Sequence, residues 1–405
     1  GSSNQTALTT VPATSTDYYI EFTRDGNDFT VRFTTSSDYT GGETKSVTLA
    51  SVASLRYFGF KARGDTQNNG GNVQGTIKPI IRIYNAVTTA TPATWNLGFI
   101  PTPVVSSHTG GTAGTYTADN GTVYDTYTYL SGSSNAFDLS TGGGGIDILL
   151  VGGGGGGGGD HGGGGGGGAV MKITYLKLSA QSHTVNVGAG GAGGTGNGAN
   201  VVSKEGTPGN SSIFSGSGLT SITATGGGGG NPYNNNTSVA TSGANGGGGG
   251  SATSPYNLGG TGISPSISPH TGTVHAGFDG GTGFNGTSPT NHQGGGGGGA
   301  GAVGVTPVDA SVEGGDGGNG IQISDFESSS DYYYGGGGGG TAHGNGGGDG
   351  GIGGAGGGAY YGTGGGSARN TGVTAGGGGS PGGAAGANTG GGGGGGAHNG
   401  YAGGA

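Results

Sequence analysis

The sequence predicts a mainly β and irregular fold in two parts: an N-terminal antiparallel β-sandwich, followed by a bundle of extended glycine helices with display loops. Three observations support this. Short β-rich segments fill roughly the first hundred residues, glycine supplies 117 of the 405 residues, and only 15 of those glycines lie within residues 1–140. Glycine makes up roughly 7% of ordinary proteins. The two parts therefore need separate physical explanations.

The N-terminal strands are indicated by alternating apolar and polar residues. Residues 18–24 and 29–33 flank the turn sequence Asp25-Gly26-Asn27, which predicts a hairpin. Further strands are expected at residues 45–49, 55–61 and 77–84. Pro79 places the last of these at an edge or a bulge. This strand spacing predicts a sandwich over residues 1–91, and its rhythm resembles the lectin-like jelly-roll modules of viral and bacterial surface proteins.

The sequence of this first part allows a sugar-binding site, but a simpler explanation is available. One loop gathers Asp65, Asn68, Asn69 and Asn72, and Tyr57 and Trp95 have rings that could stack on a sugar. Asn and Gly are also ordinary turn residues, and the aromatic side chains suit a core. The simpler explanation is preferred.

Residues 92–122 are rich in Pro, Thr, Gly and Ser without periodicity, which predicts a connector. The glycine-rich domain is expected over residues 123–405. Its core is expected at residues 142–326, with further glycine runs in residues 327–405.

Nine uninterrupted glycine runs define this second part. They are residues 142–145, 152–159, 162–168, 226–230, 246–250, 294–299, 335–340, 376–379 and 390–396. Glycine-rich sequence usually indicates a flexible linker. Here the runs have similar lengths, they adjoin strand-like segments such as residues 146–151 and 173–178, and the segments between them differ from one another. These features indicate an ordered structure.

Polyglycine has no side chain to bury and loses more backbone entropy on ordering than any other residue. The extended three-fold helix called polyglycine II suits it, because every N–H and C=O points outward. With no Cβ in the way, such helices can hydrogen-bond to several neighbours and satisfy their backbone without an apolar core. The sequence therefore predicts a bundle of polyglycine II helices whose connectors emerge at its ends.

The succession of strands and runs resembles the glycine-rich domain of bacteriophage tail fibres. The matching segments are residues 148–159, 162–170, 176–178, 184–191, 223–230 and 320–323. The resemblance covers about residues 137–326. It implies a receptor-binding fibre tip of the T-even type, outside the cell on the virion, that recognises a bacterial outer-membrane protein or glycan. The expected partners on the virion are the fibre shaft or further copies of the chain, and the strand-rich start permits either a trimer or the single chain of the T-even type. The N-terminal part and the glycine-rich sequence after Gln322 depart from those adhesins.

The connectors are the expected receptor-binding loops, because binding residues tend to lie on loops that a scaffold holds. Tyr supplies large contact area and Asn supplies adaptable hydrogen bonds. The candidate residues are Tyr233, Asn235, Tyr256, His270, His275, Phe278, Phe284, His292, Tyr332, Tyr333, Tyr334, Tyr360 and Tyr361. Residues 251–293 and 332–334 are favoured. The alternative is that these aromatic side chains cap the bundle ends and shield hydrogen bonds there.

Composition argues against several other classes of function. There is no cysteine and the net charge is −9, which disfavours disulfides, thiol chemistry and nucleic-acid binding. No apolar run of membrane-spanning length occurs, so no membrane insertion is expected. Gly188–Gly193 fits a dinucleotide fingerprint, but no helix-forming sequence follows it. No cofactor is expected.

Metal sites and enzyme chemistry are not expected either. Residues 314–320 hint at a calcium repeat that lacks its tandem copies. Asp160-His161 is interpreted as a turn between two runs rather than as a ligand pair, so no metal is expected. No G-x-S-x-G nucleophile motif occurs in a strand–turn–helix setting, and no enzyme site is expected.

Three other classes of protein remain as alternatives. An antifreeze-like structural protein would need a regular tripeptide repeat, whereas this sequence has irregular inserts. A non-viral extracellular adhesive or matrix protein of the same architecture differs little in sequence from a tail-fibre adhesin. Disordered glycine repeats would show fast hydrogen exchange throughout residues 142–396.

Overall fold

The computed structural model describes most of the second part of the chain and five strands of the first. The described residues are 19–25, 28–34, 43–48, 81–83, 93–95, 103–118, 123–196, 204–233, 239–252, 257–285, 292–309, 313–324, 326, 331–344, 346–398 and 400–405. The chain divides into two compact units, Gly1–Ile100 and Pro101–Ala405. Across the described ranges, no helix has the length and apolar character needed to cross a bilayer.

The first unit contains an antiparallel sheet of three strands. β1 (Tyr19–Asp25), β2 (Asp28–Thr34) and β3 (Glu43–Thr48) lie in the order β1-β2-β3. β1 and β2 pair from Tyr19 opposite Thr34 to Asp25 opposite Asp28, which confirms the predicted hairpin. β4 (Ile81–Ile83) pairs with β5 (Ala93–Trp95). The expected strand at 55–61, with Tyr57, and the Asp65–Asn72 loop lie outside the described residues.

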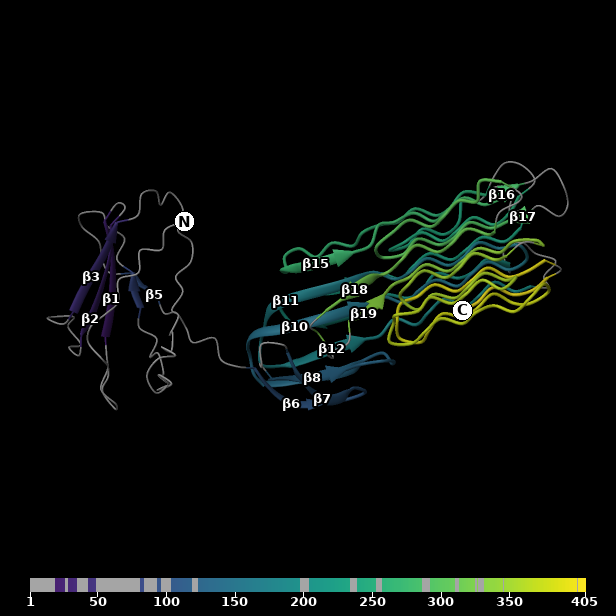
Figure 1. The fold of residues 1–405 in the computed structure, drawn as a ribbon. Helices are drawn as coiled ribbons and strands as arrows, with labels where there is room; N and C mark the ends of the chain where they lie inside the picture. Colours follow the sequence, from purple (N-terminus) through teal and green to yellow (C-terminus); the bar gives the residue numbers. More distant parts are fainter. Residues whose placement is uncertain are drawn as a thin grey trace, which may run out of the picture. The chain divides into compact units, whose positions relative to one another are not determined.

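The second unit carries two larger sheets and three strand pairs (Figure 1). The five-stranded sheet has the order β14-β13-β12-β9-β6, from β6 (Val104–His108), β9 (Asn135–Thr141), β12 (Ser182–Asn186), β13 (Ser212–Gly216) and β14 (Leu219–Ala224). The three-stranded sheet contains β10 (Gly143–Val151), β11 (Val170–Leu178) and β15 (Gly272–His275). The pairs are β7 (Thr112–Thr117) with β8 (Val123–Thr128), β16 (Phe284–Asn285) with β17 (His292–Gln293), and β18 (Ile321–Ile323) with β19 (Tyr332–Tyr334).

The apolar core belongs to the strands and not to the glycine runs. Side chains from both larger sheets form one buried cluster, which includes Phe137, Met171, Ile173, Phe214 and Ile222. A smaller cluster joins Val170 of β11 and Ala300 to Ile323 and Tyr334 of the β18–β19 pair. The strands thus bury ordinary hydrophobic surface, and the glycine region begins where that surface ends.

The β10–β11 hairpin continues directly into two glycine runs. Val151 opposite Val170 is the last paired position of the sheet. Beyond it, the amides of Gly152, Gly155 and Gly158 donate to the carbonyls of Ala169, Gly166 and Gly163, at 2.9 Å in each case. Only every third residue now bonds to the partner run. Sheet pairing therefore changes to a three-residue pattern at the position where side chains stop.

Residues 162–169 show where the other backbone amides go. Gly163, Gly166 and Ala169 donate to the segment that contains the 226–230 run, at 2.7–2.9 Å. Gly164 and Gly167 donate to Gly295 and Gly298 of the 294–299 run. Gly162, Gly165 and Gly168 donate to Gly396, Gly393 and Gly390 of the 390–396 run. Successive residues thus donate to three different neighbours, and the pattern repeats every three residues.

This packing requires glycine because the backbones lie in direct contact. A Cβ built on Gly163, Gly164 or Gly165 would overlap the carbonyl oxygen of Gly248, Gly338 or Gly155, respectively. Each overlapping oxygen belongs to the backbone of a neighbouring segment, so no side-chain movement could relieve the overlap. The runs therefore form one block, called here the glycine block, made of seven runs: residues 152–159, 162–168, 226–230, 246–250, 294–299, 335–340 and 390–396.

Two of the nine runs lie differently. Gly143–Gly145 belong to strand β10, where the preceding β9 and the following apolar residues favour sheet pairing. Gly377 and Gly378 lie against the rings of Tyr361 and Tyr360 rather than against another run. A run of four glycines is short, and its neighbours in sequence decide its conformation.

Candidate functional site

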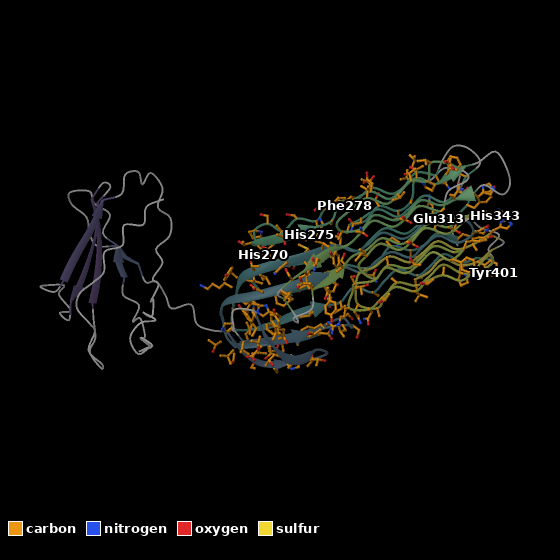
Figure 2. The ribbon with its side chains drawn as sticks, in the orientation of Figure 1. His270, His275, Phe278, Glu313, His343 and Tyr401 are labelled. Carbon is orange, nitrogen blue, oxygen red and sulfur yellow. The ribbon has the colours of Figure 1, made fainter. Side chains whose placement is uncertain are left out.

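The glycine block has two ends with different contents. One end carries the sheets and is called the strand end. The other, called the histidine end, is formed by residues 160–161, 292–293, 341–343, 360–361, 397–398 and 400–401, where runs begin, end or reverse direction. Backbone bonds join these turns: the amide of Asp160 donates to Tyr401 O at 3.0 Å, and that of His343 donates to His292 O at 3.0 Å. Figure 2 shows His343 and Tyr401 at one end of the block and His270 and His275 at the other.

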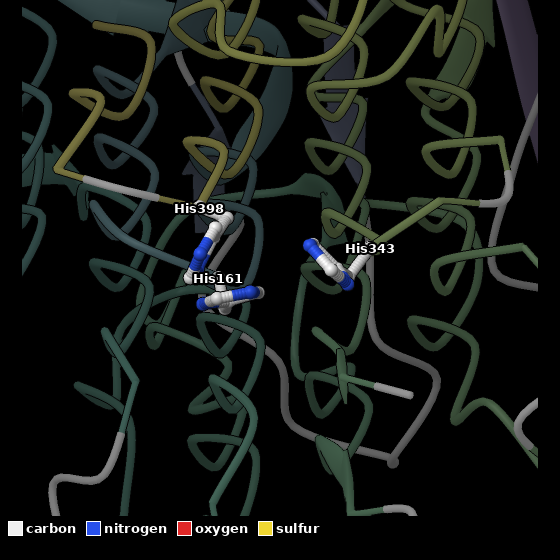
Figure 3. Close-up of side chains that lie close together, drawn as sticks. All are labelled: His161, His343 and His398. Atoms are coloured by element: carbon white, nitrogen blue, oxygen red, sulfur yellow. The ribbon is translucent and has the colours of Figure 1, made fainter. Parts of the chain in front are cut away.

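Four histidines from separate turns meet at the histidine end. The ring centroid of His161 lies 4.6 Å from that of His398, 5.0 Å from that of His292 and 5.6 Å from that of His343. The rings of His343 and His398 are 4.8 Å apart. Figure 3 shows His161, His343 and His398 reaching toward one another from three different segments. These four residues are called the histidine cluster.

Tyrosine rings line the same cluster. The Tyr233 ring lies 5.2 Å from that of His161 and 5.0 Å from that of His292, and the Tyr360 ring lies 6.2 Å from that of His343. Tyr361 and Tyr401, which are 72% and 39% exposed, extend this aromatic surface toward solvent. The histidine end thus combines a buried polar centre with exposed aromatic side chains.

The hydrogen bonds of His292 assign its tautomer. Ser251 Oγ lies 3.0 Å from Phe284 O and 3.1 Å from His292 Nδ1. The Phe284 carbonyl can only accept, so the serine hydroxyl donates its one proton there and the Nδ1–H of His292 donates to Oγ. Ser251 is fully buried, and its hydroxyl serves to fix this imidazole.

The other cluster members leave ring nitrogens without hydrogen bonds. His161 is 2% exposed, and neither of its nitrogens makes a hydrogen bond within the described residues. Its Nδ1 lies 3.4 Å from Asp160 Oδ1, a contact within ion-pair distance whose geometry is not that of a hydrogen bond. The buried Nδ1 atoms of His343 and His398 are also without partners there. Such buried nitrogens are costly.

Burial is the main cause that lowers the pKa of two cluster members, His161 and His292, and so favours their neutral form. Burial lowers the pKa of His161, Asp160 opposes this, and His398 and His343 lower it further. Burial and the neighbouring histidines lower the pKa of His292 to about 4. Burial alone raises the pKa of Asp160, but its contacts with His161 and with Lys204, whose Nζ lies 2.7 Å from Oδ2, outweigh burial and hold that pKa at about 2. A neutral imidazole keeps a lone pair on one nitrogen.

Two turns at this end have unusual backbone conformations. Asp160 and His161 have φ values of 53°, and Tyr360 and Tyr361 have φ values of 69° and 68°. Positive φ is uncommon outside glycine and costs most for bulky side chains. In these turns, tyrosine and histidine stand where glycine would be less strained. Such strain at a surface turn points to a role for the side chains.

The predicted loop residues fall at different places. Tyr233, Phe284, His292, Tyr360 and Tyr361 lie at the histidine end. His270, His275 and Tyr332–Tyr334 lie at the strand end, where His270 Nε2 approaches Thr220 O at 2.8 Å and Tyr334 is 4% exposed in the smaller core cluster. Phe278 lies along the block between the two ends (Figure 2). Asn235 and Tyr256 lie outside the described residues.

Sequence reasoning did not identify the histidine cluster. It interpreted Asp160-His161 as a turn, which the backbone bears out, and it did not place His343 or His398 beside His161. A signal was available in the sequence. His161, His343 and His398 each follow a long glycine run within three residues, and His292 precedes one by two. Histidines placed this way reach the same end of the block when the runs stack.

Long glycine runs bonded through their backbones and flanked by short strands define a glycine-rich structural domain. The family described as "Glycine-rich domain" matches residues 128–384, and the chain belongs to this family. No curated protein and no solved structure matches the chain.

Proposed function

We propose that this chain is the receptor-binding tip of a bacteriophage tail fibre, an adhesin that recognises the bacterial surface through turns at the end of a polyglycine II bundle. It would act outside the cell, on the virion. Its receptor would be an outer-membrane protein or a glycan. The N-terminal unit, as a β-sandwich, would attach to the fibre shaft or join copies of the chain into a trimer.

The three-residue hydrogen-bond period supports the polyglycine II helix as the conformation of the runs. Three residues per turn is the period of that helix, and amides at i, i+1 and i+2 of residues 162–168 donate to three different neighbours. A β-strand would direct its bonds to two sides only. Such a bundle is a rigid support for turns.

The observation that carries the proposed function is the convergence of aromatic and histidine side chains at the histidine end. Tyr233, Tyr360, Tyr361 and Tyr401 come from segments far apart in sequence, yet the block brings their turns together. Tyrosine provides a large, rigid and amphipathic contact surface at low entropic cost. Loops on a rigid scaffold are the usual place for recognition.

Binding of the labelled full chain to a panel of bacterial strains, read by flow cytometry, tests the proposal. We expect saturable binding to some strains. The affinity should fall at least about tenfold in Tyr361→Ala and in Tyr401→Ala, as for interface hot spots. Tyr175→Ala is the matched control, because Tyr175 is 82% exposed on β11 at the strand end. Equal loss in all three variants, or no binding to any strain by a folded chain, would contradict the proposal.

The alternative is a non-viral structural or adhesive extracellular protein. An antifreeze-like role predicts thermal hysteresis in solution and no strain-dependent binding to cells. A matrix or cellular adhesin predicts cell binding that does not block phage adsorption. Competition between the purified chain and phage for a strain that it binds separates the last case from the tail-fibre role.

A further inference from the structure

We propose that His161, His343 and His398 form a binding site for a divalent transition-metal ion of the zinc class at the histidine end. The site goes beyond the proposed function and does not depend on it, because its evidence is the geometry of three side chains.

The distances bring three donors to one point. One ligand atom from each histidine lies within 4.8 Å of the other two. Some point therefore lies within about 2.8 Å of all three atoms, compared with the usual Zn–N distance of about 2.0–2.1 Å. Small rotations of the rings close that difference, and His343 and His398 have room for them because they are only partly buried.

Packing alone does not account for the histidine cluster, because several of its buried ring nitrogens have no hydrogen-bond partner within the described residues. Neutral imidazole has one donor and one acceptor, yet both nitrogens of buried His161 and the buried Nδ1 atoms of His343 and His398 make no hydrogen bond within the described residues. Unpartnered buried polar atoms in one place call for a ligand, an ion or water. A metal ion would bind a nitrogen from each histidine.

Asp160 supplies a feature common around metal-bound histidines. Its Oδ1 lies 3.4 Å from His161 Nδ1, which leaves Nε2 as the ligand atom of His161. A carboxylate beside the other ring nitrogen orients a ligating histidine and raises its basicity. Lys204 in turn holds the second carboxylate oxygen of Asp160 at 2.7 Å.

The ligand set selects the class of metal. Imidazole nitrogens suit Zn²⁺, Cu²⁺ and Ni²⁺, whereas Mg²⁺ and Ca²⁺ prefer oxygen ligands. Three protein ligands leave a fourth position on a tetrahedral ion for water or for a group from a bound partner. The ion would also tie together three turns that are distant in sequence.

Isothermal titration of the full chain, prepared without a histidine tag, with Zn²⁺ tests the site. We expect one tight ion per chain and no comparable binding of Mg²⁺. Loss of an outer partner of a metal ligand typically costs about 10–100-fold in affinity, so His343→Gln and His398→Gln should each weaken binding by at least that much. His270→Gln is the matched control, because His270 is partly buried at the strand end. Equal affinities for all four proteins, or affinity no tighter than millimolar, would overturn the proposal.

A second measurement uses the unaltered chain, so its result does not depend on whether the variants fold. Diethyl pyrocarbonate modifies accessible histidines, and mass spectrometry locates the products. Zn²⁺ should protect His343 and His398 while leaving His270 and His275 as reactive as before. Unchanged modification of His343 and His398 with Zn²⁺ present would overturn the site.

Discussion

At the scale of single residues, the absence of a Cβ is what permits the glycine block. Each interior glycine places its Cα against a carbonyl of a neighbouring segment, so the interior is backbone packed on backbone. Substitution by alanine, which is nearly neutral in many loops, is therefore severe inside the block. The cost depends on position, because some glycines face open space.

Gly165→Ala should destabilise the second unit. The new methyl would overlap the Gly155 carbonyl, and overpacking of this kind costs about 1–3 kcal/mol. Gly366→Ala is the control, because nothing lies within 4 Å of a Cβ there. It should be neutral or stabilising by about 0.4–1 kcal/mol through the unfolded chain. Chemical denaturation measures both, and equal effects would contradict backbone contact as the reason for glycine.

At the scale of elements, the sequence predicted part of the strands, but it predicted a connector over residues 92–122, where β6 and β7 lie. Strong β character indicated strands in residues 146–151 and 173–178, and β10 and β11 contain them. Side chains specify such elements because one face must be buried. Glycine runs carry no such information. The runs Gly142–145 and Gly376–379 lie outside the block, because the residues that flank each run determine its conformation.

Tyr129, which follows β8, should make the stability of the second unit depend on pH in the alkaline range. Burial, with smaller contributions from Asp138 and Tyr127, raises its pKa to about 12, and its hydroxyl donates to Ala136 O at 3.0 Å. Because the pKa is raised in the folded state, the contribution of Tyr129 to the free energy of unfolding is complete below pH 10. It is lost as the pH rises toward 12. Stability should fall over that range.

Denaturant midpoints measured between pH 9 and pH 12 on the two variants Tyr129→Phe and Tyr175→Phe check this. The first should be less stable at neutral pH and show a shallower alkaline decline, because its ring cannot ionise. The second alters an exposed tyrosine and should behave as the unaltered chain. An unchanged slope in Tyr129→Phe would show that other groups cause the decline.

At the scale of the whole molecule, the order in which runs stack creates the candidate site. His161 and His398 are neighbours because residues 162–168 bond to residues 390–396. Identical glycine runs do not encode which neighbour each takes. Side chains in the connectors help to determine which runs lie side by side. Buried Asn245, for example, donates to Gly167 O at 2.8 Å and accepts from the Phe278 amide at 3.2 Å. For this reason the spacing of the histidines from the runs indicates a shared end of the block, but not which histidines become neighbours.

Hydrogen exchange followed by mass spectrometry tests whether the runs of the glycine block are ordered and open together. Amides in residues 152–168, 294–299 and 335–340 should exchange slowly and at similar rates, because each run is bonded to several others. In Gly165→Ala, protection should fall in distant runs as well as locally. Fast exchange throughout the unaltered chain would contradict an ordered block, and a purely local loss in the variant would contradict cooperative opening.

The three-residue repeat also restricts how such a domain can change in length. One added glycine would rotate the remainder of a run by a third of a revolution, and each amide beyond it would then face the wrong neighbour. Three added glycines would restore every pairing one step farther along. Insertions and deletions inside the runs should therefore survive only in triplets, whereas a change of length in a turn leaves the repeat within each run unaltered.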